Sequence, residues 1–130
     1  MGTRSTIKFF DDEEQTIPLC NIYQQFNGYL EGVGIELAEW LSKKKVINGI
    51  GSGQDTEEYT NGMGCLAAQF IRDHKTRVGG LYITNQDDSE EYNYSVFPRG
   101  DSIIISVDDN NDFEGTPQEF IDYVNSLSNQ

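Results

Sequence analysis

The stretch Tyr92–Val107 (YNYSVFPRGDSIIISV) decides the fold class that the sequence predicts. Its two halves, Tyr92–Phe97 and Ser102–Val107, are rich in β-branched and aromatic residues, which is typical of strands. The tetrapeptide Phe97–Gly100 has Pro second and Gly fourth, which favours a type I turn. We therefore predict that the two halves pair as a β-hairpin.

Further strand patterns lie upstream of this hairpin. Thr6–Phe10 and Ile17–Phe26 are also rich in β-branched and aromatic residues, and the polar link 11–16 between them indicates a second hairpin. Gly80–Thr84 is a shorter candidate strand. It precedes Tyr92–Phe97 along the chain, so we expect the last three strands to form an antiparallel meander.

Three segments have the periodicity of helices. Leu30–Lys45 and Met63–Lys75 carry apolar residues three and four positions apart, and the lysines that end the first segment suit the negative pole of a helix dipole. Thr116–Glu119 has a capping Thr, a Pro at the first helical position and a Glu three residues after the cap, so it opens a final helix. Val46–Gly62 is predicted to be a long loop.

The predicted order is therefore β-β-α-α-β-β-β-α. Such an order indicates an α+β fold with a mostly antiparallel sheet of about five strands and helices packed on one face. The length favours a single domain over residues 1–130.

The charge excludes several classes of partner. The chain has 22 acidic against nine basic residues, a formal net charge of -13. Phosphate backbones and anionic membranes bind basic faces, so neither duplex DNA nor a membrane surface is expected as a partner. The sequence contains no apolar run of membrane-spanning length and no signal-peptide pattern, so we expect a cytoplasmic protein. The two cysteines and one histidine lack metal-ligand spacing, so we expect no metal and no cofactor.

The acidic residues are concentrated in four stretches, 11–14, 55–58, 87–91 and 108–114. Solvated loops are the general interpretation of such runs. In the predicted meander, however, the last two stretches leave the sheet at the same end. The alternative is therefore an acidic surface for a basic partner, formed by Asp87, Asp88, Glu90, Glu91, Asp108, Asp109 and Asp112.

Glycines, aromatic rings and amides mark a candidate ligand site near the predicted helix starts. Glycine there lets a ligand approach exposed backbone N–H groups, tyrosine rings can stack on a base, and amides can bind its edge or a ribose. Arg4 can hold a phosphate in bidentate fashion. The glycines match no Walker or Rossmann loop, so turn formation and cross-strand packing are the alternative interpretation. The candidate residues are Thr3, Arg4, Tyr23, Gln25, Asn27, Gly28, Tyr29, Gly32, Gly64, Gln69, Tyr92 and Tyr94.

A catalytic role is not favoured by the sequence. His74 is the only histidine, it is placed at a predicted helix end, and no Ser or Cys partner is indicated for it. Cys65 is interpreted as a small packing residue. We therefore predict no catalytic residues.

Four motifs stand out together: Met1–Ser5, Tyr23–Tyr29 with Gly32 and Gly34, Gly62–Gln69, and Glu90–Tyr94. Together they resemble a family of small uncharacterised proteins of phage, prophage and bacterial genomes. The chain departs from that family's pattern, which tends to have Asp-Gly-Tyr-Pro and Gly-His-Gly where residues 27–30 read Asn-Gly-Tyr-Leu and residues 32–34 read Gly-Val-Gly.

The resemblance implies a phage setting in the host cytoplasm, in which small acidic proteins counter host defence. The first hypothesis is a non-catalytic protein that binds and sequesters a small nucleotide-like immune signalling molecule. The alternative is an acidic, nucleic-acid-mimicking inhibitor of a basic host defence protein. A nucleotide hydrolase is the weaker alternative. A homo-oligomer with a shared pocket is compatible with a chain of this size.

Overall fold

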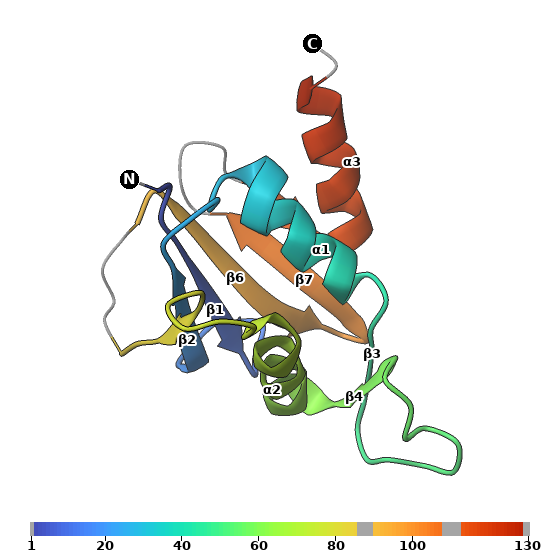
Figure 1. The fold of residues 1–130 in the computed structure, drawn as a ribbon. Coiled ribbons are helices and arrows are strands. Elements are labelled where there is room, and N and C mark those ends of the chain that lie inside the picture. The colour runs from blue at the N-terminus through green and yellow to red at the C-terminus, as the bar shows by residue number, and fades with distance from the viewer. Residues whose placement is uncertain (1, 86–89, 108–112, 129–130) are drawn as a thin grey trace.

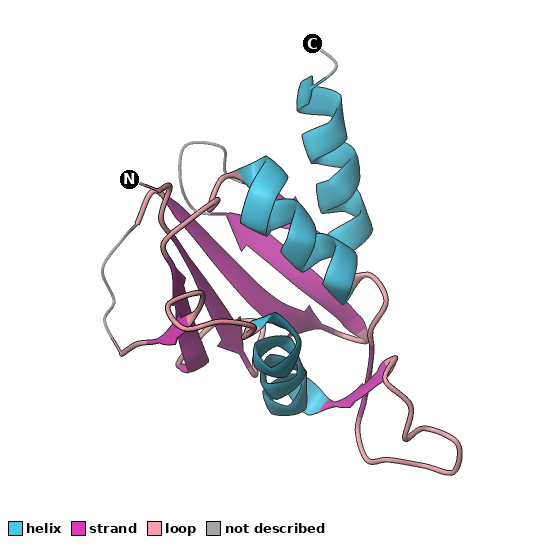
Figure 2. Ribbon diagram, viewed as in Figure 1, coloured by secondary structure: helices cyan, strands magenta, loops and turns pink. Residues whose placement is uncertain are grey.

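The computed structural model describes residues 2–85, 90–107 and 113–128, and the chain folds as an α+β structure, as the sequence predicts. Figure 1 shows the main sheet with three α-helices on one side of it, and Figure 2 distinguishes helices, strands and loops. The described elements are β1 (Ser5–Phe10), β2 (Pro18–Gln24), η1 (Leu30–Gly34), α1 (Ile35–Leu41), β3 (Lys45–Ile47), β4 (Tyr59–Asn61), α2 (Gly62–His74), β5 (Tyr82–Ile83), β6 (Tyr92–Arg99), β7 (Ser102–Val107), β8 (Phe113–Gly115) and α3 (Pro117–Ser128).

The main sheet has six strands in the order β5-β2-β1-β6-β7-β8. β1 pairs antiparallel with β2, and β6 pairs antiparallel with β7, so both predicted hairpins are confirmed. The predicted meander is wrong, because β5 pairs with β2 and β6 lies parallel to β1. The physical reason is burial. Ile7 lies beside Tyr94 and Phe9 beside Val96, and all four side chains are fully buried, whereas both residues of β5 are exposed.

The β6–β7 turn lies two residues later than predicted. β6 continues through Pro98 to Arg99, which pairs with Ser102, so Gly100 and Asp101 form the connection. Gly100 has a φ of +61°, a value that glycine adopts without strain and that two-residue hairpin turns require. β6 is therefore two residues longer at its end than predicted, whereas β7 has the predicted bounds.

The first helical segment is shorter and less regular than predicted. It begins with five π-helical residues (η1) and continues as α1, which ends at Leu41 instead of Lys45. The chain leaves the helix because the Lys45 N–H donates a hydrogen bond of 2.7 Å to the Glu58 carbonyl, within a parallel β3–β4 pair. The segment Val46–Gly62 is therefore not a plain loop, since it holds most of β3 and all of β4.

The other two helices follow the prediction closely. α2 buries Met63, Leu66, Ala67 and Phe70, which share one helical face. α3 begins with the predicted capping box. The Thr116 N–H donates to Glu119 Oε1 (2.8 Å), and the Glu119 N–H donates to Thr116 Oγ1 (3.2 Å).

One face of the sheet and the three helices share the main core. Alternate strand residues such as Ile7, Val96 and Ile105 pack there against the helices, while Phe10, Phe97 and Ile104 form a small separate cluster. α1 contacts α3, and α2 contacts β1 and β2. Side chains also join α1 to α2, since Trp40 packs edge-on against Phe70 and its Nε1 donates to Asp73 Oδ2 (2.9 Å). Among the described residues, no helix is long and apolar enough to cross a membrane.

Candidate functional site

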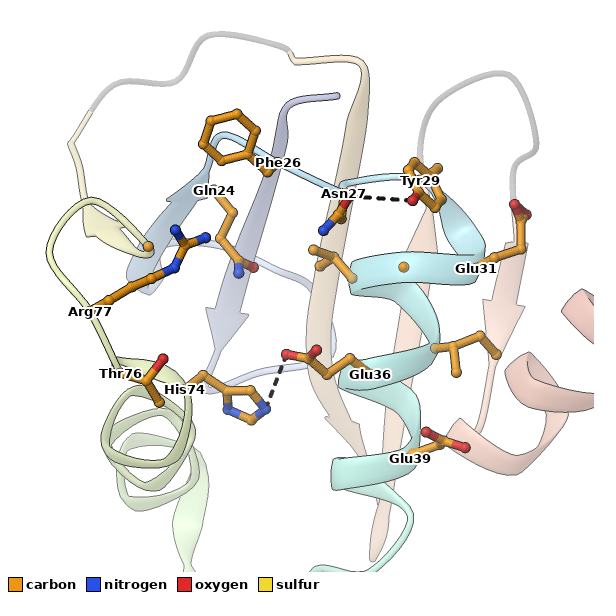
Figure 3. A pocket seen from close by; sticks show the side chains of 14 residues that line it. Gln24, Phe26, Asn27, Tyr29, Glu31, Glu36, Glu39, His74, Thr76 and Arg77 are labelled. Atoms are coloured by element: carbon orange, nitrogen blue, oxygen red, sulfur yellow. Dashed lines mark hydrogen bonds and ion pairs between the residues drawn. The ribbon is translucent and has the colours of Figure 1, made fainter. Parts of the chain in front are cut away.

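A groove of about 530 Å³ lies between α1 and α2, beside the end of β2. In Figure 3, Gln24 and Arg77 lie on the side of the groove opposite Glu36, and the His74 ring lies close to Glu36. Three parts of the chain supply the walls: the segment that ends β2, η1 with α1, and the end of α2 with the loop that follows it. The lining residues are Gln24, Phe26, Asn27, Tyr29, Glu31, Gly32, Val33, Ile35, Glu36, Glu39, His74, Thr76, Arg77 and Gly80.

Two tight backbone contacts shape the wall that η1 forms. Asn27 has a φ of +61°, in the left-handed region that Asn tolerates, and its carbonyl accepts a hydrogen bond of 2.7 Å from the Val33 N–H. Gly32 lies so close to the same carbonyl that a Cβ atom would collide with it. The Asn27 side chain accepts a hydrogen bond of 3.3 Å from the Tyr29 hydroxyl at the edge of the groove.

His74 is held in one orientation by its neighbours on α2 and α1. Its Nδ1 lies 2.8 Å from the Phe70 carbonyl oxygen, and because a carbonyl only accepts, Nδ1 carries the hydrogen. The ring stacks on Phe70 with centroids 4.0 Å apart, and Trp40 packs edge-on against it. Its Nε2 lies 3.7 Å from Glu36 Oε1. Nε2 is therefore the ring atom that can exchange a hydrogen bond with a ligand.

Arg77 differs from the two other arginines on or after α2. Arg72 and Arg99 each hold two carboxylates, which raises the pKa of both guanidinium groups. The Arg77 guanidinium, which Figure 3 shows pointing toward Gln24, has no hydrogen bond or ion pair within residues 2–85, 90–107 and 113–128. The carboxylate partners are Glu57 and Asp73 for Arg72, and Glu13 and Glu114 for Arg99.

Gln24 also has unused hydrogen-bonding capacity. Its Oε1 is buried and has no hydrogen-bond partner in the described part of the chain, and the same is true of the hydroxyl oxygen of Ser5, its register partner on β1. A buried polar atom without a partner costs roughly 1–3 kcal/mol. Native proteins usually satisfy such atoms with water or a ligand, so Gln24 is a candidate contact in the wall of the groove.

Two aromatic rings border the groove. Phe26 is 47% exposed and Tyr29 is 38% exposed, although large rings are normally more buried. Exposed rings beside a polar groove offer faces on which a planar ligand can stack.

Three of the sequence-predicted ligand residues line the groove. Asn27, Tyr29 and Gly32 do so together, because the segment that follows β2 turns into η1. Gln25 is half-buried in the same segment and does not line the groove.

A second group of predicted residues meets elsewhere, in a cluster that we call the Gly28 junction. The Gly28 N–H donates to the Thr3 carbonyl (2.9 Å), and its own carbonyl accepts a hydrogen bond of 2.7 Å from the Tyr94 hydroxyl. Tyr94 is fully buried, and the Tyr92 N–H donates to the Arg4 carbonyl (3.3 Å). The Gly28 junction therefore fastens the chain that follows β2 to β1 and β6. The junction comprises Thr3, Arg4, Gly28, Tyr92 and Tyr94.

The remaining predicted ligand residues lie apart from both places. Tyr23 packs on Tyr82 with ring centroids 5.8 Å apart. The Gln69 amide donates a hydrogen bond of 3.2 Å to the Tyr59 carbonyl and so ties α2 to β4. Gly64 is exposed in the first turn of α2.

The acidic surface falls mostly outside the described residues, which do not include Asp87, Asp88, Asp108, Asp109 or Asp112. Although the meander is wrong, Tyr94 pairs with Val107, so the start of β6 and the end of β7 share one end of the sheet. Glu90 and Glu91 precede β6 there, and Glu114 lies in β8 rather than in a loop. The acidic-surface hypothesis stays a prediction.

The sequence analysis did not predict Gln24, Glu36 and Arg77 as site residues. It considered His74 only for a catalytic role and not as a ligand contact. The available signal was Arg77 between a helix end and a Gly-Gly pair, in a chain with few cations. The pairing of α1 with α2 across a groove could not be read from local sequence patterns.

The lining offers amides, carboxylates, one guanidinium and aromatic rings that a ligand can contact. The lining residues include no Ser or Cys, and His74 Nε2 lies 3.7 Å from Glu36 Oε1. Within the described ranges, no group of three or more His, Cys, Asp or Glu residues could hold a metal ion. Comparison with protein families, with curated proteins and with solved structures returned no match to this chain.

Proposed function

We propose that this protein binds and sequesters a small nucleotide-like molecule in the groove between α1 and α2. The observation that carries the proposal is the pair of unused polar groups in one groove. The Arg77 guanidinium and the Gln24 carbonyl oxygen both lack partners among the described residues, and the exposed Phe26 ring lies beside them.

Each part of a nucleotide has a complementary group here. A guanidinium binds phosphate oxygens through two parallel hydrogen bonds, which suits Arg77. Phe26 and Tyr29 can stack on a base, and the Gln24 and Asn27 amides can bind its polar edge. Glu36, whose side chain is 62% exposed, can accept hydrogen bonds from ribose hydroxyls.

Sequestration rather than turnover is proposed because of the groove's chemistry. None of the lining residues is a Ser or Cys nucleophile. The resemblance to phage and prophage proteins extends the proposal to a role in counter-defence, in which the ligand is an immune signalling molecule of the host.

Isothermal titration calorimetry tests the proposal with a stated panel: adenosine, AMP, ATP, 3′,5′-cyclic AMP and GMP, cyclic di-AMP, cyclic di-GMP and cyclic ADP-ribose. At least one compound should bind the wild-type protein. Arg77→Ala should weaken that binding at least tenfold, about 1.4 kcal/mol. Arg99→Ala is the matched control, because it removes the same charge at a site outside the groove.

Chromatography of the bound compound separates sequestration from hydrolysis. The compound released from the protein by heat should be chemically unchanged after prolonged incubation. Recovery of a hydrolysed product that depends on His74 would instead favour the hydrolase alternative. If no compound of the panel binds, the proposed ligand class is rejected.

A further inference from the structure

We infer that the groove selects nucleotides whose phosphates are diesters, with one negative charge each, over nucleotides that end in a free phosphate or a polyphosphate chain. This inference rests on the proposed function and specifies the ligand class of the same site. It follows from the balance of charge that the groove presents to an anion.

The groove offers one permanent cation, and Glu36 is the carboxylate that points toward its side of the groove. Arg77 is the only Lys or Arg among the lining residues, whereas Glu31, Glu36 and Glu39 all line the groove. Glu36 is the nearest of these to the centre, since Figure 3 shows it pointing toward His74 and toward the side of Arg77 and Gln24. Glu31 and Glu39 extend from the other side of η1 and α1 in the same view.

A single diester phosphate matches this balance. Its one charge can be neutralised by the Arg77 guanidinium through two hydrogen bonds. A terminal phosphate carries up to about two charges near neutral pH, and a triphosphate more, so the excess charge would face Glu36 without a second Lys or Arg. Like charges a few ångströms apart repel more strongly at a partly shielded surface than in bulk water.

The net charge of the whole chain also disfavours ligands with several negative charges. The formal net charge of -13 gives the chain a field that repels polyanions at long range. Arg72 and Arg99 cannot assist Arg77, because each is already held by two carboxylates outside the groove. The lining therefore lacks the cluster of cations that polyphosphate sites require.

The test compares ligands that differ in phosphate charge on the same base: 3′,5′-cyclic AMP and cyclic di-AMP against AMP and ATP, each titrated by calorimetry into the wild-type protein. The diesters should bind at least tenfold more tightly than AMP and ATP. Glu36→Gln should narrow this ratio at least threefold, because it removes the carboxylate that repels the additional charge. Glu13→Gln makes the same change outside the groove and should leave the ratio unchanged.

The outcomes separate the two claims. AMP or ATP binding as tightly as the diesters would overturn the inference and leave the proposed function standing. Diester selectivity that Glu36→Gln does not narrow would overturn the electrostatic origin assigned to it. If none of these compounds, nor cyclic ADP-ribose or the guanine diesters, binds the wild-type protein, the proposed function fails and the inference with it.

Discussion

The groove and the Gly28 junction lie close together in sequence, since Asn27 and Gly28 are neighbours, but their polar groups are used differently. In the Gly28 junction the Tyr94 hydroxyl, the Gly28 N–H and the Thr3 carbonyl all have partners within the chain. In the groove the Arg77 guanidinium and Gln24 Oε1 have none among the described residues. Polar groups that are already satisfied hold a fold together, and those left unsatisfied are available to a ligand. Neighbouring residues of one segment therefore contribute to two places with different uses of their polar groups.

The largest expected effect is on stability, from Tyr94→Ala. Tyr94 is fully buried and packs against Phe120 with ring centroids 6.4 Å apart, so its truncation should lower the free energy of unfolding by about 3–5 kcal/mol. Chemical denaturation measures this change. Tyr23→Ala, at a half-buried ring, should cost clearly less.

Tyr94→Phe keeps the ring and removes only the hydrogen bond to the Gly28 carbonyl. It should cost about 1 kcal/mol of stability and leave nucleotide binding intact. Lost binding at unchanged stability would show that Tyr94 contacts the ligand, as the sequence predicts. The Gly28 junction would then be part of the ligand site, and the distinction between the two regions would be wrong.

A smaller effect, of opposite sign, is expected from Gln24→Leu. The change removes a buried oxygen without a partner and keeps the side chain's approximate volume, so the ligand-free protein should be unchanged or more stable by up to about 1 kcal/mol. Nucleotide binding should weaken at the same time.

Gln69→Leu is the matched control, because the Gln69 amide is used within the chain. It should destabilise the protein by about 1 kcal/mol through the lost hydrogen bond to the Tyr59 carbonyl, without changing binding. If Gln24→Leu destabilises the protein as much as Gln69→Leu, the idea that Gln24 is reserved for a ligand is wrong.

The smallest effect concerns Asp73, which supports the helices beside the groove. Hydrogen bonds from Arg72 and from Trp40 Nε1 hold the pKa of the Asp73 carboxyl below its usual value of 3.8. A lowered folded-state pKa adds stability above the unfolded pKa, and this stability is lost as the pH falls through the folded value.

Asp73→Asn should therefore lower the unfolding free energy modestly at neutral pH, and the gap to the wild type should narrow as the pH falls below 3.8. Denaturation curves of both proteins at about pH 6 and about pH 2.5 give the difference in unfolding free energy at each pH. Asp101→Asn, an exposed residue in the β6–β7 turn, is the control. A gap in unfolding free energy that does not narrow at the lower pH would mean that packing, rather than the ionised carboxylate, is responsible.

Sequence patterns predicted those parts of the fold that local chemistry determines. The capping box of α3 depends on Thr116 and Glu119 alone, and the two hairpins depend on adjacent strands. The parallel pairing of β1 with β6 could not be predicted in this way, because it joins residues such as Thr6 and Asn93 that are far apart in sequence.

The candidate site was predicted only in part, because local sequence patterns reveal only those residues that lie in one continuous segment. Asn27, Tyr29 and Gly32 belong to one continuous segment, and their glycine and amide pattern is visible in the sequence. Arg77 and Glu36 reach the groove from different elements, so only the packing of α1 and α2 on one sheet face reveals them. Tyr94 was misleading, since a tyrosine on a strand has the same appearance in sequence whether it faces a ligand or the core.

The most direct measurement is calorimetric titration of the nucleotide panel into the wild-type, Arg77→Ala and Arg99→Ala proteins, with unfolding curves recorded for all three. We predict that a panel member binds the wild type, that Arg77→Ala binds it at least tenfold more weakly at unchanged stability, and that Arg99→Ala binds as the wild type does. A panel without any bound compound, or an Arg77→Ala protein that binds as tightly as the wild type, would contradict the assignment of the groove as the ligand site.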